Sequence, residues 1–263
     1  MKKLITVCLV LVLMAVTTSV AYAASALPSD NFNDNSQNTS MWNLYEENSS
    51  KVWLYENNQQ LEIHSAGNSG DVSANYVANG WGLSTAEDFS FRANFHASSL
   101  LGSGQYEFDA MLGLAKFGDF ATMSNNNASL GAGYYSYDNG SEKQIWGDKT
   151  TDGIHVNERE ITRSSDDGIL YISYNTILDE LYMSDTGYGT TNAFVTISGL
   201  LRGEWKADVV SPILSGDAEN VVLTSGDAFL DDFVVESGTI VPEPTTICLL
   251  GLGALSLIRK KIG

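Results

Sequence analysis

Glu107 and Asp109 are the residues of this chain whose type and spacing could most directly support catalysis. They lie two positions apart in a segment that alternates polar and apolar residues, so both carboxylates share one face of an extended strand. Two carboxylates hydrolyse a glycosidic bond when one acts as nucleophile and the other as acid, about 5 Å apart in retaining enzymes. The alternative is that Glu107 and Asp109 form the solvent face of an amphipathic strand.

Aromatic residues suited to sugar binding flank the turn Asp138-Asn139-Gly140. Tyr135 and Tyr137 share one face of the preceding segment, Trp146 follows the turn, and Trp81 lies in a predicted loop. A flat ring covers the apolar face of a pyranose, while polar groups at the edge fix its hydroxyls. These four aromatic residues are therefore candidates for carbohydrate binding, and packing in the core or across strands is the alternative.

Short strands must position these residues. Alternation of apolar and polar residues predicts strands at 89–95, 106–114, 170–174 and 229–235. Clusters of Asn, Asp, Ser and Gly predict turns at 56–58, 66–70, 124–127, 138–140 and 166–168. For segment 179–183 we favour a strand over a helical turn, and we assign Trp42 and Trp53 to the core. The pattern predicts an all-β fold, an antiparallel β-sandwich formed by one domain at 24–238.

Composition limits the function of this domain. The only cysteines, Cys8 and Cys248, lie in the end segments, so the domain has no disulfide and depends on packing for its stability. The net charge of −18 disfavours nucleic acid as a partner. The sequence contains no Gly-x-Ser-x-Gly elbow and no phosphate-binding loop, and its three histidines lack the close spacing of metal ligands. We expect no cofactor other than a structural metal ion.

The N-terminus has the organisation of a secretory signal peptide. Lys2 and Lys3 precede an apolar run at 4–20, and the small residues Ala21 and Ala23 form a cleavage pattern. The sequence therefore predicts a signal helix at 1–23, export through the Sec machinery, and cleavage by signal peptidase after Ala23.

The C-terminus has a different organisation, which begins with Pro242-Glu243-Pro244. The two prolines prevent a strand or helix from continuing into the tail. Residues 245–258 carry no charge, and Arg259, Lys260 and Lys261 follow at once. A helix over this uncharged stretch would cover about 20 Å of a hydrocarbon core of roughly 30 Å, and the basic end would stay on the cytoplasmic side. We expect a short transmembrane helix that holds the domain outside the membrane.

These C-terminal parts, at 239–263, resemble the PEP-CTERM sorting signal of Gram-negative bacteria. The resemblance implies that an exosortase recognises Pro242-Glu243-Pro244 and removes the tail. It also implies a protein that is anchored transiently in the inner membrane and then delivered to the cell surface, the extracellular matrix or a biofilm.

The domain itself resembles concanavalin A-like, or laminin G-like, jelly rolls. Segment 29–36, followed by Trp42, is similar to their opening strand and turn, and segment 230–235 is similar to their closing strand. Segments 168–176 and 181–184 are similar to a central hairpin. In that fold the first and last strands are neighbours, so the ends of the domain would lie together.

The resemblance to jelly rolls also bears on whether Glu107 and Asp109 are catalytic. Glu107 and Asp109 match the first two acids of the Glu-x-Asp-x-x-Glu signature of one glycoside hydrolase family of this fold. Leu112 occupies the position of the second glutamate, so the acid and base of that family is missing. We therefore expect the domain not to be an enzyme.

Neighbouring end strands would also bring acidic residues together. Asp30 or Asp34 could then approach Asp231 or Asp232, and convergent carboxylates suit Ca²⁺, which takes six to eight oxygen ligands. The resemblance therefore implies a structural calcium site, and ordinary turn aspartates are the alternative.

Three functions stay open on the sequence alone. The first is a non-catalytic surface or matrix protein that binds polysaccharide or another surface protein. The second is a secreted glycoside hydrolase or lyase of the jelly-roll class, and the third is a purely structural surface protein. We favour the first.

Overall fold

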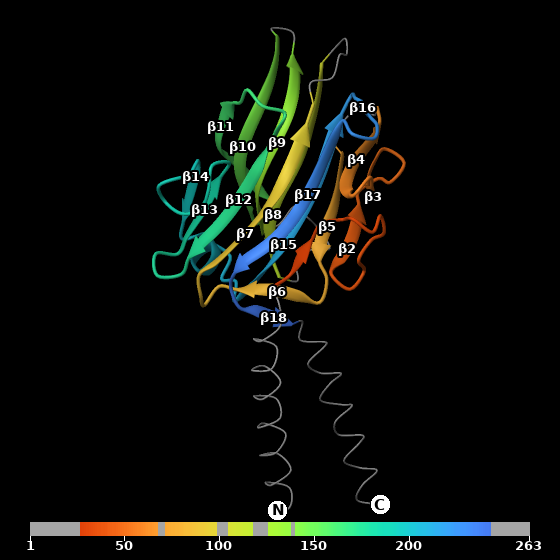
Figure 1. Ribbon diagram of the computed structural model, residues 1–263. Coiled ribbons are helices and arrows are strands. Elements are labelled where there is room, and N and C mark those ends of the chain that lie inside the picture. The colour runs from red at the N-terminus through yellow and green to blue at the C-terminus, as the bar shows by residue number, and fades with distance from the viewer. Residues whose placement is uncertain (1–26, 68–71, 99–104, 118–125, 138–139, 243–263) are drawn as a thin grey trace, which may run out of the picture.

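The computed structural model describes residues 27–67, 72–98, 105–117, 126–137 and 140–242 of the chain. Two antiparallel β-sheets pack face to face as a sandwich (Figure 1). The signal helix predicted at 1–23 and the transmembrane helix predicted at 245–258 lie outside the described residues. Within the described ranges, no helix has the length and apolar character needed to cross a membrane.

The first sheet, sheet A, holds nine strands. In spatial order its path is β14 (Val195–Ser198), β13 (Glu180–Ser184), β12 (Asp167–Asn175), β7 (Phe89–Ala97), β17 (Ala228–Ser237), β4 (Gln60–Ala66) and β16 (Val222–Leu223). Beside this path, β1 (Ser29–Asp30) pairs with β17 and β3 (Val52–Asn57) pairs with β4.

The second sheet, sheet B, also holds nine strands. Its path is β11 (Ile154–Thr162), β10 (Gly140–Thr151), β9 (Asn126–Tyr137), β8 (Tyr106–Lys116), β15 (Val209–Glu219), β5 (Val72–Ala78) and β2 (Trp42–Glu46). β6 (Trp81–Ser84) pairs with β15, and β18 (Ile240–Pro242) pairs with β6. A single π-helical turn, η1 (Leu200–Glu204), precedes β15.

The prediction of an antiparallel β-sandwich is confirmed. The four strands expected from alternation correspond to β7, β8, β12 and β17, and segment 179–183 forms most of β13. The first and last strands of the resemblance are neighbours, because Asp30 of β1 pairs with Phe233 of β17. Strand pairing continues past residue 238, since Ile240–Pro242 forms β18 on the edge of β6.

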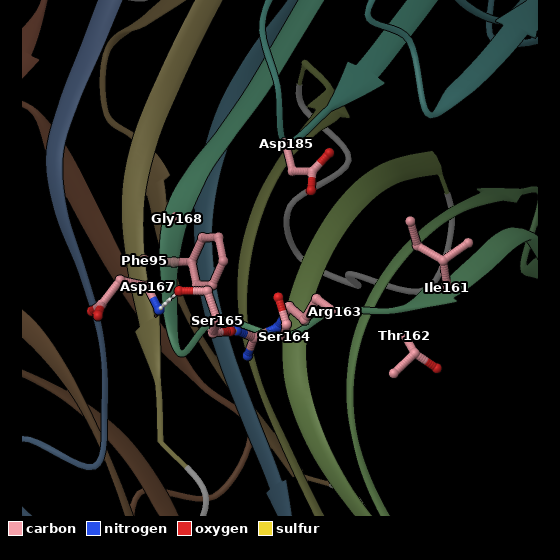
Figure 2. Close-up of a pocket in the computed structure, with 9 residues that line it drawn as sticks. All are labelled: Phe95, Ile161, Thr162, Arg163, Ser164, Ser165, Asp167, Gly168 and Asp185. Atoms are coloured by element: carbon pink, nitrogen blue, oxygen red, sulfur yellow. Dashed lines mark hydrogen bonds between the residues drawn. The ribbon is translucent and has the colours of Figure 1, made fainter.

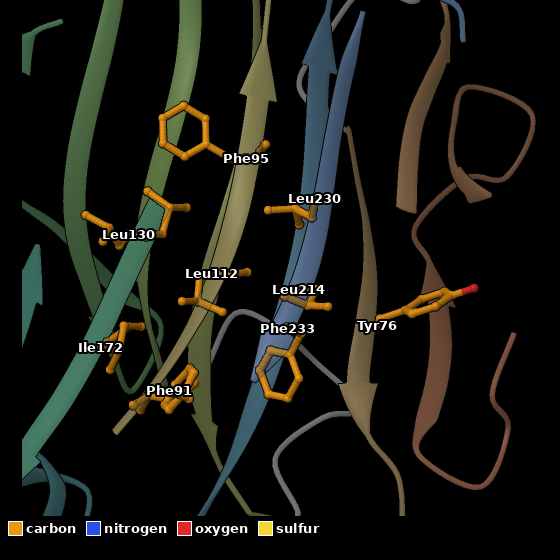
Figure 3. Close-up of a cluster of buried hydrophobic side chains, with 14 of the residues drawn as sticks. Tyr76, Phe91, Phe95, Leu112, Leu130, Ile172, Leu214, Leu230 and Phe233 are labelled. Atoms are coloured by element: carbon orange, nitrogen blue, oxygen red, sulfur yellow. The ribbon is translucent and has the colours of Figure 1, made fainter. Parts of the chain in front are cut away.

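Strict alternation along the central strands builds the core between the sheets. Phe91 and Phe233 of sheet A are fully buried, as are Leu112 and Leu214 of sheet B, and Figure 3 shows these side chains gathered between the two layers. Their burial removes apolar surface from water at about 25 cal/mol per Å². A core of this kind stabilises the fold without a disulfide.

Of the two tryptophans assigned to the core, Trp42 lies there and Trp53 does not. Trp42 is fully buried, as predicted, and meets Phe233 edge to face at 5.0 Å between ring centroids. The assignment of Trp53 to the core is wrong. Alternation along β3 turns its side chain outward, where it is partly exposed and stacks on His64 at 5.7 Å.

Glu56 is an exception to the apolar interior. Its side chain points inward from β3 and is 3% exposed. The Tyr76 hydroxyl and the backbone of Asn38 face the carboxylate and lower its pKa, although neither makes a hydrogen bond of ordinary geometry to it. Burial is the largest cause of the raised pKa of Glu56, and together with the nearby charges of Asp30 and Asp34 it raises the pKa from 4.5 to about 7. The folded state therefore holds a proton here more tightly than the unfolded chain does.

This buried acid predicts a pH-dependent stability. Because the folded pKa lies above the unfolded value, the contribution of the protonated group is complete below pH 4.5 and is lost as the pH rises through about 7. Between those limits the free energy of unfolding of the wild-type chain should fall by up to about 3 kcal/mol relative to that of Glu56→Gln, which does not titrate. Denaturant unfolding of both proteins across this pH range measures the difference, and parallel pH profiles would contradict the assignment.

Candidate functional site

The candidate site lies on the outer face of sheet B, around the central strand β8. The registers of β8 with β9 and with β15 run without a shift, so its side chains alternate strictly between core and surface. Phe108, Ala110 and Leu112 face the core and are fully buried. Glu107 and Asp109 face outward together, as the sequence predicted.

Asp109 is the centre of this face. One carboxylate oxygen accepts a hydrogen bond from the Tyr135 hydroxyl at 2.7 Å, and the other accepts one from Trp146 Nε1 at 2.8 Å. The side chains of Tyr135 and Trp146 are partly exposed, whereas Asp109 is 4% exposed. Two predicted sugar-binding aromatic residues and one predicted catalytic acid therefore form a single cluster.

Two glycines of β9 make this cluster possible. A Cβ atom at Gly131 would lie 2.3 Å from the Trp146 indole, so the ring lies across the backbone of β9 on its way from β10 to β8. A Cβ atom at Gly133 would lie 1.8 Å from an oxygen of Asp109. The missing side chains leave room for a flat ring against the sheet, anchored at its edge by the carboxylate. We call Tyr135, Trp146 and Asp109 the aromatic platform.

The electrostatics of the platform favour a protonated Tyr135. Burial raises the pKa of its hydroxyl well above the usual value, and the charges of Asp109, Asp217 and Glu107 raise it further. The hydroxyl therefore remains a donor to Asp109 at any ordinary pH. The platform is a fixed structure that does not titrate at Tyr135.

Further carboxylates surround the platform. Across the pairing of β8 with β15, Glu219 lies opposite Glu107 and Asp217 lies opposite Asp109. Side chains directly opposite in an antiparallel pair have Cβ atoms about 5 Å apart, and like charges there are destabilising. Sequence reasoning missed Asp217 and Glu219, although their alternation in β15 could have placed them on one face of a strand.

A buried acid continues the acidic face along β10. Asp148 accepts a hydrogen bond from Ser129 N at 3.2 Å, and its second oxygen lies 2.5 Å from Nε2 of the exposed His155. Burial raises the pKa of Asp148, an effect that its contacts with His155 partly offset. The outer face of sheet B is thus strongly acidic next to the aromatic platform.

The other two aromatic candidates are not part of the platform. Tyr137 ends β9 on the same face as Tyr135, and its side chain lies outside the described part of the structure. The prediction that Trp81 lies in a loop is wrong, since it belongs to β6. Its side chain is 5% exposed and donates from Nε1 to the Met41 carbonyl at 3.1 Å, so the core holds this ring.

The four aspartates of the calcium prediction lie around the pairing of β1 with β17. Asp30 accepts hydrogen bonds from Phe32 N at 3.0 Å and Trp42 Nε1 at 2.9 Å. Asp34 accepts one from a nearby backbone amide, and the exposed Asp232 accepts one from Asn94. Burial raises the pKa of Asp231. The described residues contain no group of three or more acidic, His or Cys side chains arranged to hold a metal, and the calcium site stays a prediction.

A concavity of about 480 Å³ lies apart from the platform, where residues of both sheets line it (Figure 2). Its lining includes Phe95, Arg163, Asp167 and Asp185. The guanidinium of Arg163 lies 4.9 Å from the centre of the Phe95 ring, and it donates to the carbonyls of Gln144, Ala97 and Gly133. Because these carbonyls belong to both sheets, Arg163 connects the layers, and we assign it a structural role.

The glycine positions of the platform give a stability prediction. Gly133→Ala places a methyl group against Asp109 and 2.4 Å from the Phe108 carbonyl, which as backbone cannot easily move. We expect this variant to lose about 1–3 kcal/mol of unfolding free energy and to shift the fluorescence of Trp146. Gly203→Ala is the matched control, because its nearest contact would be an ordinary 3.6 Å. Equal stability of the two variants in denaturant unfolding would contradict the packing described.

The C-terminal segment matches a known family model. Residues 241–261 carry the PEP-CTERM protein-sorting motif, as the resemblance of the tail predicted. This motif implies an exported protein with a C-terminal membrane-anchoring segment. No curated protein matches the chain in sequence.

Solved structures resemble the sandwich. A laminarinase from Flavobacterium sp. UMI-01 is 10% identical, with a TM-score of 0.52 over 81% of this chain and 100% of that chain. A mutant of the Emp46p carbohydrate recognition domain is 9% identical, with a TM-score of 0.50 over 81% of this chain and 95% of that one. The sandwich has the concanavalin A-like jelly-roll fold of such glucanases and lectins, and identities this low show the fold alone.

Proposed function

We propose that this chain is an exported cell-surface or matrix protein whose sandwich binds a polysaccharide without cleaving it. The aromatic platform is the binding site in this proposal. An exosortase processes the C-terminal motif after export through the Sec machinery and cleavage by signal peptidase. The domain is thereby placed among extracellular polymers.

One observation carries the proposal, the position of Trp146. Its indole lies over Gly131 and its edge is fixed by Asp109 at 2.8 Å, so the ring is held before any ligand arrives. A sugar that stacks on the ring does not have to order it, which reduces the entropic cost of binding. The surrounding carboxylates offer acceptors for sugar hydroxyls at the edges of the ring.

The same contacts disfavour catalysis by Asp109. A carboxylate that already accepts two hydrogen bonds and is 4% exposed is poorly placed to attack or protonate a substrate. The Glu-x-Asp-x-x-Glu signature is also interrupted, since Leu112 faces the core from an unbroken strand. The platform therefore supports binding better than hydrolysis.

Glycan binding by the full chain tests this function. On a glycan array we expect selective, saturable binding that Trp146→Ala weakens by roughly 30-fold, since burial of a large ring contributes about 2 kcal/mol. Tyr135→Phe keeps the ring but removes the donor to Asp109, so we expect a smaller loss. Trp53→Ala, which removes an indole from the outer face of sheet A, is the matched control. An array with no binding, or equal losses in Trp146→Ala and Trp53→Ala, would refute the proposal.

A second candidate function is glycoside hydrolysis, and the pairing of β8 with β15 favours it. Glu107 and Glu219 lie directly opposite each other, and such pairs have Cβ atoms about 5 Å apart, close to the carboxyl separation of retaining glycosidases. In this alternative one glutamate is the nucleophile and the other is the acid and base.

Reducing-sugar release from bacterial or algal polysaccharides distinguishes the two functions. If the chain is a hydrolase, Glu107→Gln and Glu219→Gln should each abolish release. Glu236→Gln, which changes an exposed acid on β17 of sheet A, should leave the release unchanged. We expect no release from the wild-type chain, because we favour the non-catalytic function.

A further inference from the structure

Two adjacent apolar side chains lie exposed at one end of the sandwich. Ile177 and Leu178, in the turn between β12 and β13, are 85% and 57% exposed. Ile177 is the most exposed large hydrophobic residue in the described ranges. We call residues 176–179 the apolar turn.

The apolar turn is fixed to the neighbouring loop. Thr176 donates from its backbone amide to Asp88 at 2.7 Å and from its hydroxyl to the Thr85 carbonyl at 3.0 Å. The exposed Arg202 donates from its guanidinium to the Thr176 carbonyl. These contacts fix the backbone of the turn in which Ile177 and Leu178 are exposed.

The same loop is bound to β18, the last strand before the tail. Glu87 accepts a hydrogen bond from the Thr239 hydroxyl at 2.5 Å, and Ser84 N donates to the Thr239 carbonyl at 3.0 Å. β18 then pairs with β6 as far as Pro242. Figure 1 places β6, β18 and the C-terminal end of β12 at the same end of the sandwich. The apolar turn and the point where the chain leaves the domain are therefore close in the fold.

Very little chain separates this end from the membrane-anchoring segment. The PEP-CTERM motif begins at residue 241, and only Glu243 and Pro244 separate Pro242 from the uncharged run at 245–258. Two extended residues span at most about 7 Å. When the tail is anchored, this end of the sandwich must lie at the bilayer surface.

We propose that the apolar turn contacts the lipid bilayer and inserts Ile177 and Leu178 into its interfacial layer. Apolar side chains bind this layer by burial between headgroups and acyl chains. Arg202 lies beside the turn and suits the phosphate of a lipid headgroup. A chain with a net charge of −18 gains nothing from anionic lipids, so apolar contact is the interaction available to it. The anchored domain thus has two points of contact with the membrane, which fixes its orientation.

A fluorescent probe in the full chain tests the contact. Cys8→Ser and Cys248→Ser remove the native thiols, and Leu178→Cys introduces one site for an environment-sensitive nitrobenzoxadiazole label. Val222→Cys is the matched control, because Val222 is 59% exposed and lies in β16, which Figure 1 places at the other end of the sandwich. Both labelled proteins are reconstituted in phosphatidylcholine vesicles.

We expect the probe at position 178 to emit at shorter wavelength than the probe at position 222. Spin-labelled lipid should quench the probe at position 178 several-fold more strongly than the probe at position 222. Equal, water-like emission at both positions would overturn the proposal. A shift at position 178 that lipid does not quench, and that disappears when the protein is diluted in the vesicles, would assign the turn to a contact with a second copy and would also overturn it. Neither outcome depends on glycan binding.

Discussion

The unbroken register of β8 with β9 and β15 is the constraint on which the rest of the structure depends. Because no bulge interrupts this central strand, each side chain is committed to the core or to the outer face of sheet B. Leu112 fills the core, and the same rule sends Asp109 outward beneath Trp146. A bulge in β8 would turn the core-facing side chains after it outward and the outward-facing ones inward. The pairing of β8 with its neighbours therefore determines both the core and the candidate site.

The acidic surface explains why the platform needs its hydrogen bonds. Asp109 is buried beside Asp217 and Glu107 in a chain of net charge −18, and a carboxylate in that place is costly unless donors satisfy it. Tyr135 and Trp146 supply the donors and are themselves fixed by doing so. Glu56 shows the other solution, since its contacts with Tyr76 and Asn38 do not outweigh burial, and its pKa rises to about 7. The chain therefore tolerates buried acids in two ways, and only the first holds aromatic rings at the surface.

Sequence alone predicted the sandwich well, because alternation is a local property that long antiparallel strands display directly. It failed for Trp53, which alternation along β3 turns outward, and for Trp81, which the short strand β6 places in the core. It proposed Glu107, Asp109, Tyr135 and Trp146 separately, but the contact between Trp146 and Asp109 crosses a whole strand and depends on register. The glycines at 131 and 133 were the available signal, since two glycines on one face of a strand indicate a close approach of another group.

The strand β15 connects the platform with the end of the sandwich that carries β18. Val209 of β15 pairs with β6, and Asp217 of the same strand lies opposite Asp109. Eight residues of extended strand separate these two points, a distance of about 26 Å. Because β6 also carries β18, the platform lies that far along the sandwich from the strand at which the described residues end. An anchored domain would thus hold the platform well above the lipid headgroups, where a long extracellular polymer could reach it while the tether is still in place.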